Sequence, residues 1–212
     1  MKLQTRTNLA PQLLLLLAAL VLLASCSTTK PEEPTVTTKI GNGKASIPDL
    51  NAATTVHIID GGGGLGGSSS AEYTLQRIPG QFAGPGVFSM GSGGTPELKK
   101  TDNISIPLPV MQHFFATLMT SPLAQGEYHP TFIMTDSYPS ISIGIGLPQD
   151  SVLIYSRSQG ESRVPWAAKL HGKDYVIHSP APADALKILA PYLHEDELNV
   201  LYRQAIQSRN KH

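Results

Sequence analysis

The chain has 212 residues, with 16 basic and 16 acidic side chains, so its formal charge is zero. This balance argues against a nucleic-acid-binding protein, which normally carries a basic excess. The single cysteine, Cys26, excludes an internal disulfide and any metal site built from several cysteines. The length favours one folded domain, and we expect neither a metal nor a cofactor.

The N-terminus has the pattern of an export signal. Lys2 and Arg6 are the only charged residues before Lys30, and an uninterrupted apolar run covers residues 13–24. This run is shorter than the roughly 20 apolar residues that a membrane-spanning helix needs, and it fits the apolar core of a secretory signal peptide. We therefore expect residues 1–25 to be a signal peptide.

The apolar run ends in Leu23-Ala24-Ser25-Cys26, which resembles the lipobox of bacterial lipoprotein precursors. The resemblance covers residues 1–26 only. It implies that the Cys26 thiol takes a diacylglycerol group, that the bond between Ser25 and Cys26 is cleaved, and that the new amine is acylated. Several acyl chains hold a protein stably on a membrane. The alternatives are an ordinary signal peptide with an incidental cysteine and an uncleaved anchor.

The residue after the cysteine bears on the membrane to which the protein is sorted. In the lipoprotein family an Asp at this position tends to retain the protein at the inner membrane, and here the residue is Ser27. The resemblance therefore implies a lipid-anchored protein of the cell envelope, on the outer membrane and facing the periplasm. Its expected partners are the membrane, through the acyl chains on Cys26, and an envelope protein, peptide or glycan, with no nucleic acid.

Loss of Lys2 and Arg6 with the signal peptide would leave 14 basic and 16 acidic side chains, a formal charge of −2. A net charge this small does not indicate any class of binding partner. The next segment, residues 26–53, begins with polar and proline residues, and we expect it to be a lipidated, flexible tether. A small hairpin over residues 36–47, turning at Gly41–Gly43, is the alternative for part of it.

Glycine dominates the next part of the chain. Residues 54–59 are β-branched and predict a strand, but 12 of the 19 glycines lie between residues 61 and 94. We expect residues 54–103 to be dominated by loops with short strands between them. Gly61, Gly63 and Gly66 match the G-x-G-x-x-G pattern of nucleotide sites, but no helix follows them, and the match carries no prediction.

Regular patterns return after residue 104. Pro109 can begin a helix, and the spacing of the apolar residues predicts that it runs over 109–120. Strict alternation predicts a strand over 140–147, with isoleucines on one face and only Ser and Gly on the other. That flat second face is either solvent-exposed or a platform for an extended ligand. A further strand is expected over 152–157, and helices over 184–190 and 194–207.

The next hairpin is predicted to pair residues 166–170 with residues 175–179, turning at Gly172-Lys173. This register sets Leu170 opposite Tyr175 and places His171 and Asp174 as a pair beside the turn. Sequential strands joined by short turns indicate an antiparallel sheet, so we expect an α+β fold in which a few helices pack on that sheet. The expected single domain spans residues 54–207, followed by a tail over 208–212.

None of the seven histidines has the spacing of a metal or catalytic motif, and we assign no catalytic residue. The favoured hypothesis is a non-catalytic binding or structural domain. Its possible contact residues are Trp166, Tyr138, Ser158 and Gln159, although a core position for Trp166 is the alternative. The second hypothesis is an envelope hydrolase with a site near Asp136, His171 and His178.

Overall fold

The computed structural model describes residues 45–64, 67–92, 95–126, 140–157, 161–194 and 196–209. All of them belong to one compact unit, Pro34–His212. Cys26 and Ser25 lie outside the described residues, as do Tyr138, Ser158, Gln159 and Asp136. Within the described ranges, no helix has both the length and the apolar character needed to cross a membrane.

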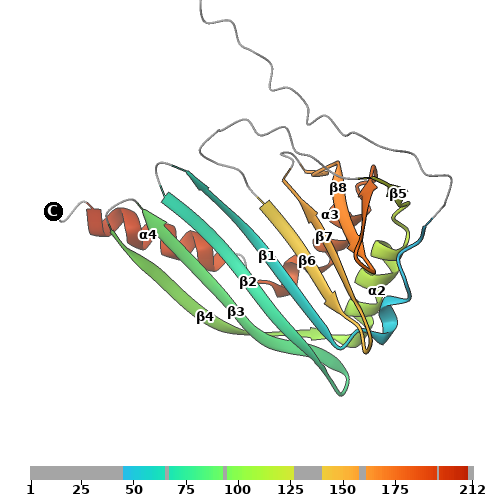
Figure 1. Cartoon of the computed structure of the whole chain (residues 1–212). Helices are drawn as coiled ribbons and strands as arrows, with labels where there is room; N and C mark the ends of the chain where they lie inside the picture. The colour runs from blue at the N-terminus through green and yellow to red at the C-terminus, as the bar shows by residue number, and fades with distance from the viewer. Residues whose placement is uncertain are drawn as a thin grey trace, which may run out of the picture. The chain divides into compact units, whose positions relative to one another are not determined.

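The described residues form a nine-stranded antiparallel sheet (Figure 1). Its strand order is β4-β3-β2-β1-β6-β7-β8-β9-β5. The strands are β1 (Thr55–Gly64), β2 (Gly67–Ile78), β3 (Gln81–Ser92), β4 (Thr95–Pro107), β5 (Ala124–Gln125), β6 (Ser140–Gly146), β7 (Ser151–Ser156), β8 (Trp166–Leu170) and β9 (Lys173–Ile177). The helical elements are η1 (Leu50–Ala52), α2 (Leu108–Met119), α3 (Ala181–Leu189), η2 (Ala190–Tyr192) and α4 (Asp196–Arg209).

Two four-stranded meanders, β1–β4 and β6–β9, meet side by side where β1 pairs with β6. Each meander joins neighbouring strands directly, which is why the pairings within it are antiparallel. The β1–β6 and β5–β9 pairings are antiparallel as well. The predicted class, an antiparallel sheet packed by a few helices, is confirmed.

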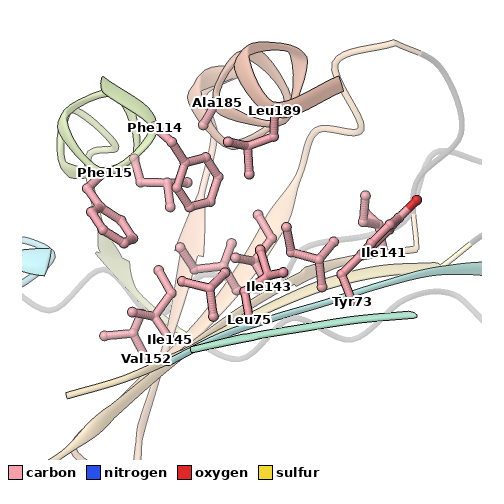
Figure 2. Packing of buried hydrophobic residues seen from close by; sticks show 14 of the residues in the cluster. Tyr73, Leu75, Phe114, Phe115, Ile141, Ile143, Ile145, Val152, Ala185 and Leu189 are labelled. Carbon is pink, nitrogen blue, oxygen red and sulfur yellow. The ribbon is translucent and has the colours of Figure 1, made fainter. Parts of the chain in front are cut away.

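The helices cover one face of this sheet (Figure 1). Helix α2 begins at Leu108, one residue before the predicted Pro109, and its buried stripe repeats at helical spacing through Met111, Phe114, Phe115 and Leu118. Figure 2 shows these phenylalanines above the isoleucines of β6. The alternation predicted for β6 is confirmed, since Ile141, Ile143 and Ile145 are buried while the residues between them are half-buried.

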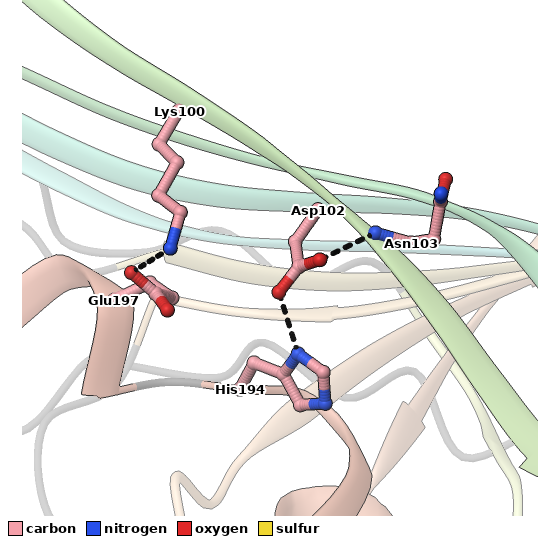
Figure 3. Close-up of polar contacts among 5 residues, drawn as sticks. All are labelled: Lys100, Asp102, Asn103, His194 and Glu197. Atoms are coloured by element: carbon pink, nitrogen blue, oxygen red, sulfur yellow. Dashed lines mark hydrogen bonds and ion pairs between the residues drawn. The ribbon is translucent and has the colours of Figure 1, made fainter.

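Helix α3 lies beside α2 and buries Ala185 and Leu189 against the same core (Figure 2). Helix α4 and the segment just before it are tied to β4 by two polar contacts (Figure 3). Lys100 pairs with Glu197 at the start of α4, and the Asp102 Oδ2 lies 2.9 Å from His194 Nδ1. Glu197 therefore has a partner across the fold in addition to the positive end of its own helix dipole.

The expectation of a loop-dominated segment over residues 54–103 is wrong for the residues that the structure describes. Apart from Thr54 and the turn at Pro79-Gly80, they lie in β1–β4, each at least ten residues long. At Gly84 the reason is close approach, because a Cβ there would stand 2.0 Å from the Thr74 carbonyl oxygen of the neighbouring strand. Glycine here permits tight strand packing instead of flexibility.

The predicted tether over residues 26–53 is too long at its C-terminal end. Ile47 and Leu50 are buried in the core, and Asp49 caps η1 by accepting a hydrogen bond from the backbone N–H of Asn51. Ala45 also forms a β-bridge with Leu123. The packed domain therefore includes residues 45–53, and the rest of the predicted tether lies outside the described residues.

The hairpin of β8 and β9 has a register two residues away from the predicted one. Leu170 pairs with Lys173, and the turn residues are His171 and Gly172, with φ angles of 49° and 72°. Two consecutive positive φ angles are those of a type I′ turn, whose twist suits a two-residue hairpin. His171 therefore does not pair with Asp174. Its Nδ1 lies 2.6 Å from Asp150 Oδ2 instead.

Candidate functional site

A cavity of about 240 Å³ lies between the helix-covered face of the sheet and α3. Its floor comes from three neighbouring strands, with Ile58 on β1, Ile141 on β6 and Tyr73 on β2. Leu186 of α3 and Leu193, which follows η2, close it from above. A hollow of mostly aliphatic walls with a few polar groups is the usual form of a small-ligand site.

The central polar feature of the cavity is an ion pair between Asp60 and Arg163. Arg163 Nη2 lies 3.1 Å from Asp60 Oδ2 and 3.4 Å from Oδ1. The two side chains are 39% and 23% exposed, so the pair is partly shielded from water. Burial raises the pKa of Asp60, and the neighbouring Arg163 guanidinium only partly offsets this effect.

Asp60 occupies a position where the sheet would otherwise carry an apolar side chain. It follows Val56 and Ile58 in the buried alternation of β1 and pairs in register with Ile141 of β6. A carboxylate that continues an apolar row is therefore the sequence signal for this site. Arg163 had no such signal, because it lies in the connection between β7 and β8.

Three contacts of its neighbours hold Arg163 in place. The buried Ser156 hydroxyl can donate to the Arg163 carbonyl or, at 3.2 Å, to that of Pro165. The Trp166 indole N–H donates to the Ser162 carbonyl at 2.9 Å. Arg163 itself has a φ of 49°, a left-handed conformation that costs a non-glycine residue roughly 1 kcal/mol. The connection is therefore fixed at some conformational cost, a frequent property of binding sites.

Arg163 also retains an unused donor. Its Nη1 is buried and has no hydrogen-bond partner among the described residues. A guanidinium has five N–H groups in a fixed plane, and the contact with Asp60 uses only Nη2. A ligand in the cavity cannot reach this buried atom, so the unsatisfied donor adds a cost of about 1–3 kcal/mol to the way in which Arg163 is held.

Two further charged residues line the cavity, Glu161 and Lys187. Lys187 Nζ lies 3.0 Å from Asp184 Oδ1, and this hydrogen bond, with a smaller effect from Glu161, raises the pKa of Lys187. The charged lining residues therefore comprise two acids and two bases. The cavity has no excess charge of either sign.

Trp166, predicted as a possible contact residue, is in the core. Its side chain is fully buried, and its single polar group, the indole N–H, donates a hydrogen bond to the Ser162 carbonyl. It supports the site only through the connection that carries Arg163. Its predicted companions Tyr138, Ser158 and Gln159 lie outside the described residues, so the structure does not place them.

The structure does not bring together the two described histidines of the hydrolase hypothesis. His171 is in the turn before β9 and His178 follows the end of that strand, so they are separated by about 20 Å of extended chain. Asp136 lies outside the described residues. In the described part of the chain, no three His, Cys, Asp or Glu side chains gather as a metal site would require.

The two carboxylates with shifted pKa values predict opposite effects of pH on stability. A raised folded-state pKa means that ionising Asp60 costs stability as the pH rises from 3.8 through the folded-state value. For Asp60→Asn, the free energy of unfolding relative to wild type should therefore increase with pH across that window. The measurement is urea unfolding at closely spaced pH values from 3 to 7.

Asp102→Asn is the matched control. The hydrogen bond with His194, followed by that from the Asn103 backbone N–H, lowers the pKa of Asp102. Its stabilisation is therefore present above pH 3.8 and is lost as the pH falls through the lowered value. The stability of Asp102→Asn relative to wild type should decrease with rising pH over this range. Slopes of the same sign for the two variants would contradict the assigned environments.

Comparison of the chain with protein-family models, curated proteins and solved structures found no match to any of them.

Proposed function

We propose that the protein is a lipid-anchored lipoprotein of the bacterial cell envelope, and that its folded domain is a non-catalytic module that binds a ligand in the cavity under α3. The single observation that carries the binding role is the Arg163 side chain. It is held by a constrained connection, and its partly exposed guanidinium lines a largely aliphatic cavity beside Asp60. Such preorganisation is what selective binding requires.

The anchor rests on the sequence Leu23-Ala24-Ser25-Cys26 and on the apolar run before it. The first described residue is Ala45, so 18 residues separate it from Cys26. If these residues are flexible, they allow the domain to stand on the order of 25 Å from the membrane surface. The cavity would then be accessible to envelope components, on the outer membrane and facing the periplasm.

Cys26→Ala should abolish incorporation of a labelled fatty acid and leave a precursor that is heavier by the signal peptide. The reason is that only the thiol can form the thioether with the diacylglycerol, and cleavage in the lipoprotein family follows this step. Metabolic labelling followed by mass spectrometry makes the measurement. Ser27→Asp is the control, since it keeps the thiol and should remain labelled. Labelling of the Cys26→Ala variant would contradict the anchor.

The binding role can be tested in cells by photocrosslinking of the full chain. A photoreactive residue in place of Glu161 lies at the cavity, whereas one in place of the exposed Lys169 lies on the opposite face of the sheet. We expect an adduct from position 161 that is absent from position 169 and is lost when Ala183→Leu fills the cavity. Equal adducts from both positions, or none from position 161, would contradict a binding site under α3.

A further inference from the structure

The polar groups of the cavity define what a ligand must offer. The Arg163 guanidinium, which lines the cavity and belongs to a side chain that is 23% exposed, can only donate and so requires an acceptor oxygen. The Asp60 carboxylate receives one nitrogen, Arg163 Nη2, and two carboxylate oxygens together have more acceptor sites than that contact uses. The site thus offers a donor and an acceptor next to each other. A ligand group with a carbonyl and a nearby N–H complements both.

The charge of the cavity favours an uncharged ligand. Each base already faces a carboxylate, since Arg163 contacts Asp60 and Lys187 contacts Asp184. An anionic ligand would have to compete with these carboxylates and would meet Glu161 as well. A cationic ligand would gain no free counter-charge, because Asp60 already faces Arg163 and Glu161 lies near Lys187. A buried charge without a counter-charge is costly, so both charged classes are disfavoured.

The walls and the volume of the cavity limit the size of the ligand. About 240 Å³ is below the range of roughly 300–1,000 Å³ that holds a drug-sized molecule. Ile58, Ile141 and Leu186 provide aliphatic surface, which matches a branched aliphatic side chain better than the hydroxyl-covered surface of a sugar. One aliphatic residue with its flanking peptide groups satisfies these limits.

We propose that this cavity binds an aliphatic residue of an uncharged peptide segment, with the peptide carbonyl accepting a hydrogen bond from the Arg163 guanidinium and the peptide N–H donating to Asp60. This assignment rests on the proposed binding function and specifies its ligand class. Arg163 and Asp60 select the peptide group, and the aliphatic walls select the side chain.

Three probes that share the leucine side chain and differ in charge test the assignment: N-acetyl-leucinamide is neutral, N-acetyl-leucinate is anionic and leucinamide is cationic. The readout is the NMR signal of the Trp166 indole N–H. It is the only tryptophan signal of the chain, and its hydrogen bond to Ser162 reports on the connection that carries Arg163. We expect the neutral probe to bind with a Kd of about 1 mM, as its small size dictates. The Kd values of the two charged probes should be higher by a factor of about ten or more.

Two variants test whether the neutral probe binds in this cavity. Ala183→Leu fills the cavity and should abolish the shift caused by the neutral probe. Arg163→Lys keeps a positive charge beside Asp60 but loses the planar second nitrogen, and it should weaken binding about tenfold. Lys169→Ala, on the opposite face, should leave the titration unchanged. The Arg163→Lys result keeps the test valid should Ala183→Leu disturb folding.

The outcomes separate the ligand class from the binding role. Tighter binding of the acid or the amine, still abolished by Ala183→Leu, would overturn the peptide assignment and leave the cavity as a binding site. Saturable binding of the neutral probe that neither variant changes would place the ligand elsewhere and overturn both. A wild-type indole signal that does not move with any probe would also overturn both.

Discussion

Gly84→Ala should destabilise the domain by at least about 3 kcal/mol, or prevent it from folding. A Cβ at this position would lie 2.0 Å from the carbonyl oxygen of Thr74 and 3.3 Å from the Leu75 Cα, and both atoms belong to the backbone of β2. Neither can rotate away. The two strands would have to separate in the middle of the first meander, next to Pro85, which itself has no backbone N–H to offer to the ladder.

Gly144→Ala is the matched control for this prediction. Its Cβ would lie 3.6 Å from the His57 Cβ, an ordinary van der Waals contact, and its φ is not in the left-handed region. Its effect on the free energy of unfolding should stay within about 1 kcal/mol. The added methyl group does not clash with the neighbouring strand, and alanine loses less chain entropy on folding than glycine does. Urea unfolding followed by circular dichroism measures both. Equal stabilities of the two variants would show that β2 and β3 do not approach closely at Gly84.

Trp166→Ala should cost about 3–5 kcal/mol, a large part of the stability of a domain of this size. The indole is fully buried and packs in the core, and its N–H bonds the Ser162 carbonyl. The substitution therefore creates a cavity and leaves that carbonyl without its donor. Because the connection before β8 also loses a contact, peptide binding by Arg163 should weaken beyond what the stability loss alone explains.

Trp166→Phe separates packing from the hydrogen bond. Phenylalanine keeps most of the apolar volume and removes the N–H, so it should cost about 1–2 kcal/mol. Thermal unfolding followed by circular dichroism measures the stability of both variants, because neither retains a tryptophan whose fluorescence could be followed. If Trp166→Ala were as stable as wild type, the residue would belong on an exposed contact surface, as the sequence alone allowed, and not in the core.

Regular periodicity made α2 and β6 predictable. The apolar spacing of Met111, Phe114, Phe115 and Leu118 has one simple interpretation, and so has the alternation of the isoleucines of β6. The glycines of β1–β4 had two possible interpretations. A glycine suits a loop and also suits a strand whose neighbour comes very close, and only the position of the neighbouring backbone, such as Thr74 beside Gly84, distinguishes them.

The β8–β9 hairpin shows a second limit. Its predicted and observed registers differ by two residues, so both bury the same face of each strand. Hydrophobic alternation therefore could not choose between them. The turn decided the register, because His171 accepts a positive φ beside Gly172.

The cavity could be predicted only in part. Asp60 interrupts an apolar alternation and is recognisable as unusual from the sequence. Arg163 lies 103 residues further along the chain and reaches Asp60 because β1, β6 and β7 are neighbours in the sheet. Sequence spacing carries no information on such a contact, since it depends on the order of the strands.

The most direct test of ligand binding under α3 is to locate the bound probe. Intermolecular nuclear Overhauser effects between the methyl groups of N-acetyl-leucinamide and those of the protein give this location. Binding in the cavity predicts effects to Ile58, Ile141 and Leu193, which line it. Effects to the exposed side chains of Ile78 or Leu153, with none to the cavity, would contradict it.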